Sequence, residues 1–273
     1  MIALFPSREV VLEVGVLMVR WYGLLWVLSF ALAAYLLPRL SKYRELKLTH
    51  EDWRIVLAAG ITGAVIGGRL GYILLYEPGY FVERPAEIFA IWDGGMASHG
   101  GFVGVGAALW WAAKKFKIDV LSLLDVIVVP VALGLAVGRI GNFINQELFS
   151  PPALAWFAVI KNLVVAGVCW WYLVRTSPTL KQSGFSFVRR GTSPLEGEVG
   201  RQRPDEVSGQ VFSLFLILYG LLRFLVEFVR VQEFPGTFGF TRGQLFTLPL
   251  AAAGVLLWIW LGQKQRNGSA RRN

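Results

Sequence analysis

The chain has 273 residues, of which 55% are hydrophobic, and its formal net charge is +9. Its mean hydropathy is +0.54. A soluble domain has too little interior to bury so much apolar surface, so the composition indicates a protein that crosses a membrane several times. The single cysteine, Cys169, excludes an intramolecular disulfide and a multi-cysteine metal cluster, and its apolar surroundings predict a small buried side chain.

Seven apolar stretches approach the length of about 20 residues that a membrane-spanning helix needs. They cover residues 18–37, 54–77, 97–113, 119–138, 152–174, 209–229 and 244–262. The third is short and rich in glycine, and the fourth runs into a polar motif. We therefore predict an all-α, polytopic integral membrane protein with about seven transmembrane helices, built as a single membrane-embedded domain over residues 1–273.

The distribution of basic residues predicts the orientation. Of the 27 Lys and Arg residues, eighteen lie in the first, third and fifth connecting loops and the C-terminal tail, and six lie in the segments on the opposite side. Because cytoplasmic loops carry the excess of Lys and Arg, we expect the N-terminus outside and the C-terminus inside. The net positive charge is then a topology signal, and we expect no nucleic acid as a partner.

The fifth loop, residues 176–208, differs from the rest of the chain. It is rich in Ser, Gly, Pro and charged residues and poor in residues that could form a core. This composition predicts a disordered cytoplasmic loop.

Three basic residues lie within the predicted spans: Arg69, Lys161 and Arg223. A cation at the membrane centre costs about 2.5–3.5 kcal/mol on insertion scales. Such residues usually face the protein interior or a water-filled cavity, so they indicate a site.

The outer end of the fourth span reads GRIGNFINQELF and carries Arg139, Asn142 and Asn145 at three-residue spacing, with Glu147 nearby. If the helix continues, these side chains share one broad face. An arginine fork surrounded by amide donors could bind a phosphate diester. The alternative is a polar network that only ties helices together.

The sixth span ends in YGLLRFLVEFVR, which places Arg223, Glu227 and Arg230 on one helix face. Arg223 and Glu227 could form an ion pair within the helix, which reduces the cost of burying them. We consider a cationic site with a carboxylate that orients the arginine, and a purely structural ion pair as the alternative.

His99 lies among four glycines in GGMASHGG, at the outer boundary of the third span. The glycines would leave room for a ligand to approach the backbone, although a lone histidine there can also be structural. No second histidine or acid stands at metal-ligand spacing, so we expect no metal. Tyr22, in VRWYGL, could be an ordinary residue of the aromatic belt at the interface.

The order of the motifs RWYG, GGRLGY, GGMASHGG, GRIGNFIN, YGLLRFLVEFVR and RGQLFTLPL strongly resembles that of the bacterial prolipoprotein diacylglyceryl transferases, from about Arg20 to Trp260. The resemblance implies transfer of the diacylglyceryl group of phosphatidylglycerol to the lipobox cysteine thiol of a preprolipoprotein. A thioether forms and glycerol phosphate leaves, without a cofactor. It also implies a place in the bacterial inner membrane, among membrane lipids, with the active site toward the periplasmic leaflet.

The resemblance also implies the roles of individual residues. The expected catalytic residues are His99, Arg139, Arg223, Glu227 and Tyr22. The expected phosphatidylglycerol-binding residues are Arg139, Asn142, Asn145, Glu147 and Arg223, to which we add the in-span cation Arg69.

The chain departs from the family pattern after Glu147, where LFSP stands in place of the usual Leu-Trp-Gly-Arg. The following segment, PPALAWFAVIKN, takes the place of a longer outer segment and introduces Lys161. We therefore keep two alternatives to the enzyme. The first is a divergent, weakly active or inactive relative that binds phospholipid. The second is a transporter, since charges within a membrane also mark ion paths.

Overall fold

The computed structural model describes residues 10–14, 17–91, 94–145, 154–178, 208–229 and 239–270. The chain forms two compact units: the first combines Met1–Glu45 with Leu124–Asn273, and the second is Leu46–Leu123.

The first unit begins with an antiparallel hairpin of β1 (Val10–Val14) and β2 (Leu17–Arg20), which leads into α1 (Trp21–Leu40) and the short 3-10 helix η1 (Ser41–Arg44). Its other elements are α5 (Val120–Asn145), α6 (Ala155–Arg175), α8 (Gln210–Val226), η5 (Glu227–Val229) and α9 (Arg242–Ala270). The hairpin was not predicted: residues 18–20, placed in the first span, belong to a strand.

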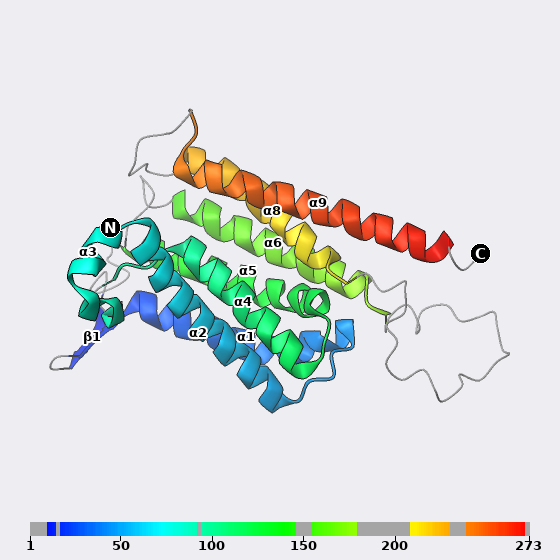
Figure 1. The fold of residues 1–273 in the computed structure, drawn as a ribbon, viewed down its shortest axis with the longest axis horizontal. Coiled ribbons are helices and arrows are strands. Elements are labelled where there is room, and N and C mark those ends of the chain that lie inside the picture. Colours follow the sequence, from blue (N-terminus) through cyan, green and yellow to red (C-terminus); the bar gives the residue numbers. More distant parts are fainter. Residues whose placement is uncertain are drawn as a thin grey trace. The chain divides into compact units, whose positions relative to one another are not determined.

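In the first unit α8 packs against both α6 and α9 (Figure 1). Small residues allow the close approach of α8 and α9. A Cβ atom at Gly220 would lie 2.8 Å from Cβ of Ala251, and one at Gly254 would lie 2.8 Å from Cβ of Leu216. Helices that pack within a membrane commonly use small residues in this way.

The second unit contains α2 (His50–Leu75), α3 (Pro78–Glu83), the 3-10 helix η2 (Pro85–Phe89) and α4 (Ser98–Phe116). A capping box begins α2. The Thr49 hydroxyl accepts a hydrogen bond from the backbone N–H of Asp52, and the Asp52 carboxylate accepts one from the backbone N–H of Thr49. Along their length α2 and α4 lie side by side (Figure 1).

Five described helical segments are long and apolar enough to cross a membrane: Trp21–Arg44, His50–Leu75, Val120–Asn145, Ala155–Arg175 and Gly243–Asn267. A shorter apolar helix covers Gln210–Val226. Large apolar side chains point outward, among them Leu74, Val103 and Leu256, which are 70%, 74% and 68% exposed. The all-α architecture with several membrane-spanning helices is therefore confirmed. The count of seven spans, the orientation of the termini and the single-domain organisation stay predictions.

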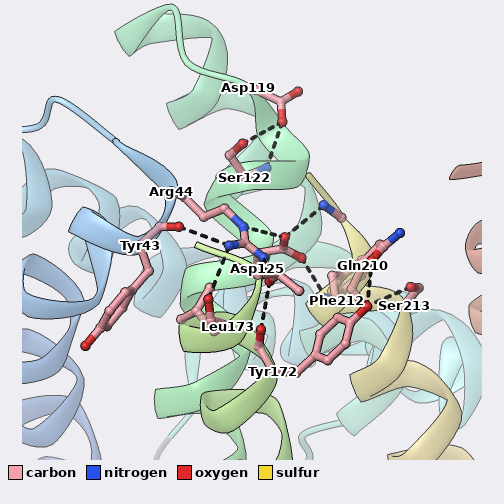
Figure 2. A network of polar contacts seen from close by, with 12 residues as sticks. Tyr43, Arg44, Asp119, Ser122, Asp125, Tyr172, Leu173, Gln210, Phe212 and Ser213 are labelled. Atoms are coloured by element: carbon pink, nitrogen blue, oxygen red, sulfur yellow. Dashed lines mark hydrogen bonds and ion pairs between the residues drawn. The ribbon is translucent and has the colours of Figure 1, made fainter. Parts of the chain in front are cut away.

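A buried ion pair joins several elements at one end of the first unit (Figure 2). Arg44 Nε donates to Asp125 Oδ2 at 2.8 Å, and the two side chains are 2% and 0% exposed. The Asp125 carboxylate also accepts from the backbone N–H groups of Gly209 and Phe212, at 2.9 and 2.8 Å. It thereby caps the first turn of α8 from a neighbouring helix, where a helix favours negative charge.

The same network includes the end of α6. Arg44 Nη2 donates to the Thr176 hydroxyl at 3.0 Å, and Nη1 donates to the Leu173 carbonyl at 3.4 Å. Thr176 and the buried Ser177 are thus part of the helix end and do not belong to a disordered loop, as was predicted for them. Residues 179–207 of that segment lie outside the described residues. Cys169 is free and buried, as predicted.

Candidate active site

The helix α5 continues through the polar motif to Asn145, which confirms the condition under which its polar residues share a face. Arg139 Nη1 donates to Asn142 Oδ1 at 2.9 Å, and the Asn142 residue is only 4% exposed. The Asn145 Oδ1 atom is buried and has no hydrogen-bond partner among the described residues. One turn of α5 thus presents an oriented arginine and an amide oxygen that can accept a hydrogen bond.

Arg223 and Glu227 form the predicted ion pair at the end of α8, with side chains that are 14% and 3% exposed. The Glu227 carboxylate also lies against Gly243, in the first turn of α9. A Cβ atom at Gly243 would lie 2.7 Å from Glu227 Oε2, so a side chain at this position would displace the carboxylate. The amino end of α9 favours a carboxylate, and Glu227 is therefore held between that helix end and Arg223.

Lys161, on the second turn of α6, is 8% exposed. Its Nζ atom lies 4.2 Å from the centre of the Tyr219 ring, one helical turn before Arg223 on α8. The ends of α5 and α8 meet the start of α6, because Phe143 and Val226 both pack against the buried Ala155 and Ala158. Helices α5, α6 and α8 therefore bring three cations together. From the sequence, Lys161 was identified as a cation within a span but was given no role. Tyr219 was not identified, although it lies four residues before Arg223 and therefore on the same face of the helix.

Tyr22, on the first turn of α1, is 37% exposed. Its ring lies against Gly141, which stands between Arg139 and Asn142 in the sequence: a Cβ atom at Gly141 would be 2.6 Å from Tyr22 Cδ2. Tyr22 thus packs on the polar turn of α5.

Arg69, on α2 of the second unit, is 7% exposed and binds the segment before α4. Its guanidinium donates, at 2.5–3.2 Å, to the carbonyl oxygens of Glu87, Ile88, Ala90, Gly94 and Gly95. All five N–H donors of the guanidinium are used in these bonds, so the lipid contact predicted for Arg69, which stays a prediction, would require one of them to break.

His99 is the second residue of α4, directly after this segment. The Ala97 N–H donates to the Gly68 carbonyl at 2.9 Å, and the Gly100 backbone packs on Gly71, where a Cβ atom would lie 2.7 Å from Gly100 Cα. The backbone is thus fixed on both sides of His99. The His99 side chain lies outside the described residues, as does Glu147.

Three of the glycines around His99 have a conformational or packing role. Gly94 and Gly95 adopt positive φ angles of 88° and 72°, and a Cβ atom at Gly95 would lie 2.7 Å from Arg69 Nη1. Gly100 makes room for α2. These three glycines let the chain turn and let α4 approach α2, and the approach of a ligand to this backbone stays a prediction. Over the ranges that the structure describes, no three His, Cys, Asp or Glu side chains are grouped as metal ligands.

Comparisons with known proteins agree with the motifs. The family model of prolipoprotein diacylglyceryl transferase matches residues 9–260. Relatives named phosphatidylglycerol–prolipoprotein diacylglyceryl transferase include one from Polaromonas naphthalenivorans, 36% identical over 94% of this chain and 96% of its own length. Another, from Methylibium petroleiphilum, is 38% identical over 93% and 96%. A third, from Photorhabdus laumondii, is 34% identical over 96% of both chains. With the family model and these relatives extending over nearly its whole length, the chain belongs to the prolipoprotein diacylglyceryl transferase family.

Proposed function

We propose that this chain transfers the diacylglyceryl group of phosphatidylglycerol to the lipobox cysteine of preprolipoproteins. The names of relatives that match almost the whole chain support this reaction. The observation that carries it is that the helix ends bearing Arg139 and Arg223 both pack against the start of α6, through Phe143 and Val226, so the two arginines lie at the same end of an apolar helical unit. Such a cationic site suits an anionic phospholipid head group.

The reaction exchanges one carbon–oxygen bond for one carbon–sulfur bond. The cysteine thiolate attacks the glycerol carbon that carries the phosphate ester, because thiolate, and not thiol, is the nucleophile. The carbon–oxygen bond breaks, its electron pair stays on the phosphate oxygen, and glycerol phosphate leaves. The phosphate changes from a singly charged diester to a doubly charged monoester, so negative charge grows on it in the transition state.

Arg139 and Arg223 stabilise this growing charge by donating to the phosphate oxygens. Asn142 orients the Arg139 guanidinium through the bond at 2.9 Å. The Asn145 Oδ1 atom, which has no hydrogen-bond partner among the described residues, accepts a hydrogen bond from a hydroxyl of the glycerol head group. Glu147 completes the set of head-group contacts.

Glu227 fixes the direction of the Arg223 guanidinium, and the start of α9 fixes Glu227. Two helix ends thereby set the position of one donor before the lipid binds. Such pre-organisation lowers the reorganisation needed in the transition state.

His99 accepts the thiol proton, since a neutral imidazole is a suitable base near neutral pH. Arg69 acts on His99 indirectly by holding the carbonyl groups of the segment that leads into α4. Tyr22 forms part of the wall of the site beside Gly141.

The membrane placement follows from the charge distribution. We place the protein in the bacterial inner membrane with seven spans, the N-terminus outside and the C-terminus in the cytoplasm. The active site then faces the periplasmic leaflet. There it would meet phosphatidylglycerol and lipobox-containing preprolipoproteins.

The test uses the purified full chain in detergent with a fluorescent lipobox peptide and dioleoyl phosphatidylglycerol. Wild type should form the thioether and release one glycerol phosphate per turnover. A peptide with serine in place of the lipobox cysteine, and phosphatidylcholine in place of phosphatidylglycerol, should give no product. Phosphatidylglycerol binding without transfer would instead support an inactive lipid-binding relative. His99→Gln, which cannot accept a proton at neutral pH, should abolish transfer at normal folded abundance; an active variant would show that the thiol proton leaves by another route.

A further inference from the structure

Lys161 is a buried cation without a matching acid. Within the part of the chain that the structure describes, no ion pair includes Lys161. The contact found for its ammonium group is the face of the Tyr219 ring, at 4.2 Å from the ring centre. A cation–π contact is worth about 2 kcal/mol when desolvated, whereas the effective penalty for burying an ion is several kcal/mol. The ring alone does not offset the burial of this charge.

The surrounding charges increase this cost. Arg139 and Arg223 stand on the helix ends that pack against the start of α6, and like charges brought together in a poorly screened environment repel. Glu227 is paired with Arg223. A group of three cations, of which Lys161 is buried and the two arginines are partly buried, beside one carboxylate is stabilised when a further anion sits among them.

From this arrangement we propose that Lys161 is a third cation of the phosphate site, where it binds the phosphate of the phosphatidylglycerol head group together with Arg139 and Arg223. This inference rests on the proposed function. The phosphate gains its second negative charge as the carbon–oxygen bond breaks, so Lys161 binds the departing glycerol phosphate more strongly than the intact lipid. Its main effect is therefore on kcat. A lysine acts as a mobile point charge, which complements the planar forks of the two arginines.

Tyr219 is the positioning residue for Lys161. Its ring is 7% exposed and stacks on Phe215, with ring centres 5.5 Å apart and planes 18° apart. The stacked rings form a fixed surface on one side of the ammonium group. The three N–H donors of Lys161 are then available on its other sides.

The experiment compares Lys161→Met, Lys161→Arg and a matched control, Lys264→Met. Lys264 is also beside an aromatic ring, with its Nζ atom 5.3 Å from the centre of Trp260, but it is exposed on α9. Initial rates are measured in detergent with dioleoyl phosphatidylglycerol and the lipobox peptide, and inhibition is measured with free glycerol phosphate. Lys161→Met should lower kcat/KM by at least about tenfold, mainly through kcat, and weaken inhibition by glycerol phosphate. Lys161→Arg should keep a larger share of the rate than Lys161→Met, and Lys264→Met should match wild type.

Thermal melts separate this role from a structural one. Without lipid, Lys161→Met should melt at or above the wild-type temperature, because it removes an unpaired buried charge. Its gain in melting temperature on adding dioleoyl phosphatidylglycerol should be smaller than that of wild type. A lower melting temperature with an unchanged lipid-dependent gain would show a structural lysine and overturn the proposal.

The kinetic measurements also test both the role of Lys161 and the proposed function. Wild-type turnover by Lys161→Met would overturn the proposal, even with weaker glycerol phosphate inhibition, because Lys161 would then bind the free product only. If wild type itself forms no thioether, the proposed function fails, and the lipid-dependent melting shift still tests whether Lys161 binds the head group.

Discussion

The Nε atom of Arg44 lies 2.8 Å from Oδ2 of Asp125, and both side chains are almost fully buried. Every charge in this network meets a partner, because Arg44 donates to neighbouring oxygens and Asp125 accepts two backbone N–H groups of α8. The opposite ends of the same helices carry Lys161, Arg139 and Arg223 with less acid to balance them. The first arrangement holds helices together, whereas the second suits an anionic ligand.

Replacing Asp125 with alanine should destabilise the protein strongly. The change leaves the buried Arg44 without its carboxylate and removes the cap of α8, and breaking one partner of a buried ion pair costs about 3–5 kcal/mol. We expect a large drop in the detergent melting temperature and in membrane abundance. The control is Glu51→Ala, which breaks the ion pair between Glu51 and Arg54. The side chains of this pair are 68% and 77% exposed, respectively. If Asp125→Ala melts like Glu51→Ala, the Arg44–Asp125 pair is not important for stability.

Gly100→Ala should disrupt the contact between α2 and α4. The added Cβ atom would overlap the Gly67 carbonyl oxygen and lie 2.8 Å from the Cα atom of Gly71. Both neighbours are backbone, so relief requires the helices to separate. Gly106→Ala on the same helix is the matched control, because its Cβ atom meets nothing within 4 Å. Gly106→Ala should melt at or slightly above the wild-type temperature, since alanine favours helix over glycine; equal melting of the two variants would argue against close glycine packing.

Arg69→Lys should loosen the segment before His99. Lysine has three donors at one point and cannot reach the five carbonyl groups that the guanidinium binds. Amide hydrogen exchange between residues 87 and 97 should become faster. Turnover should fall by about tenfold or more, because small displacements of catalytic groups are costly. Reduced turnover with unchanged exchange would instead favour the direct lipid contact that the sequence suggested.

The sequence predicted those parts of the site that follow helical spacing. Arg139 and Asn142, three residues apart on α5, share a face as expected and also contact each other, and Arg223 pairs with Glu227 one turn later. Each pair lies on a single helix, so the period of 3.6 residues was enough to place it.

Contacts between distant segments carried no such signal. Arg69 binds carbonyl groups 18 to 26 residues later in the chain. Because every residue has a backbone carbonyl group, the sequence does not indicate which of them accept these bonds. Asp125 is 81 residues from Arg44 in the sequence. Near His99, Gly95 meets the Arg69 side chain and Gly100 meets the opposite helix, and neither contact follows from the local pattern.

The orientation can be tested with single cysteines at Ser183 and Ser269. Because cytoplasmic segments carry most of the Lys and Arg residues, both positions should react with a membrane-impermeant maleimide only after the cells are permeabilised. The native Cys169 is buried and gives a low background. Labelling of either position in intact cells would reverse the orientation, and with it the periplasmic placement of His99.

Arg139→Lys and Arg223→Lys test whether two planar donors meet the phosphate. Both substitutions keep the positive charge but remove the fork that can donate two parallel hydrogen bonds. Each should lower the initial rate per folded enzyme sharply, by about a hundredfold if the donor acts mainly on the transition state. The melting temperature should change little, because lysine can still neutralise Glu227 from position 223.

The alanine variants distinguish this role from a structural one. Arg223→Ala leaves Glu227, which is 3% exposed, without its arginine, so a structural ion pair predicts a large loss of melting temperature and abundance. Arg139→Ala removes the donor to Asn142 Oδ1, in a residue that is 4% exposed, and the loss of such a buried partner costs about 1–3 kcal/mol. A purely structural Arg139 therefore predicts a lower melting temperature with little loss of rate per folded enzyme. Near-wild-type rates in both lysine variants would therefore refute the shared phosphate site. A low rate in Arg139→Lys with wild-type melting would retain it, since a folded protein with the same charge would then have lost only the geometry of its donors.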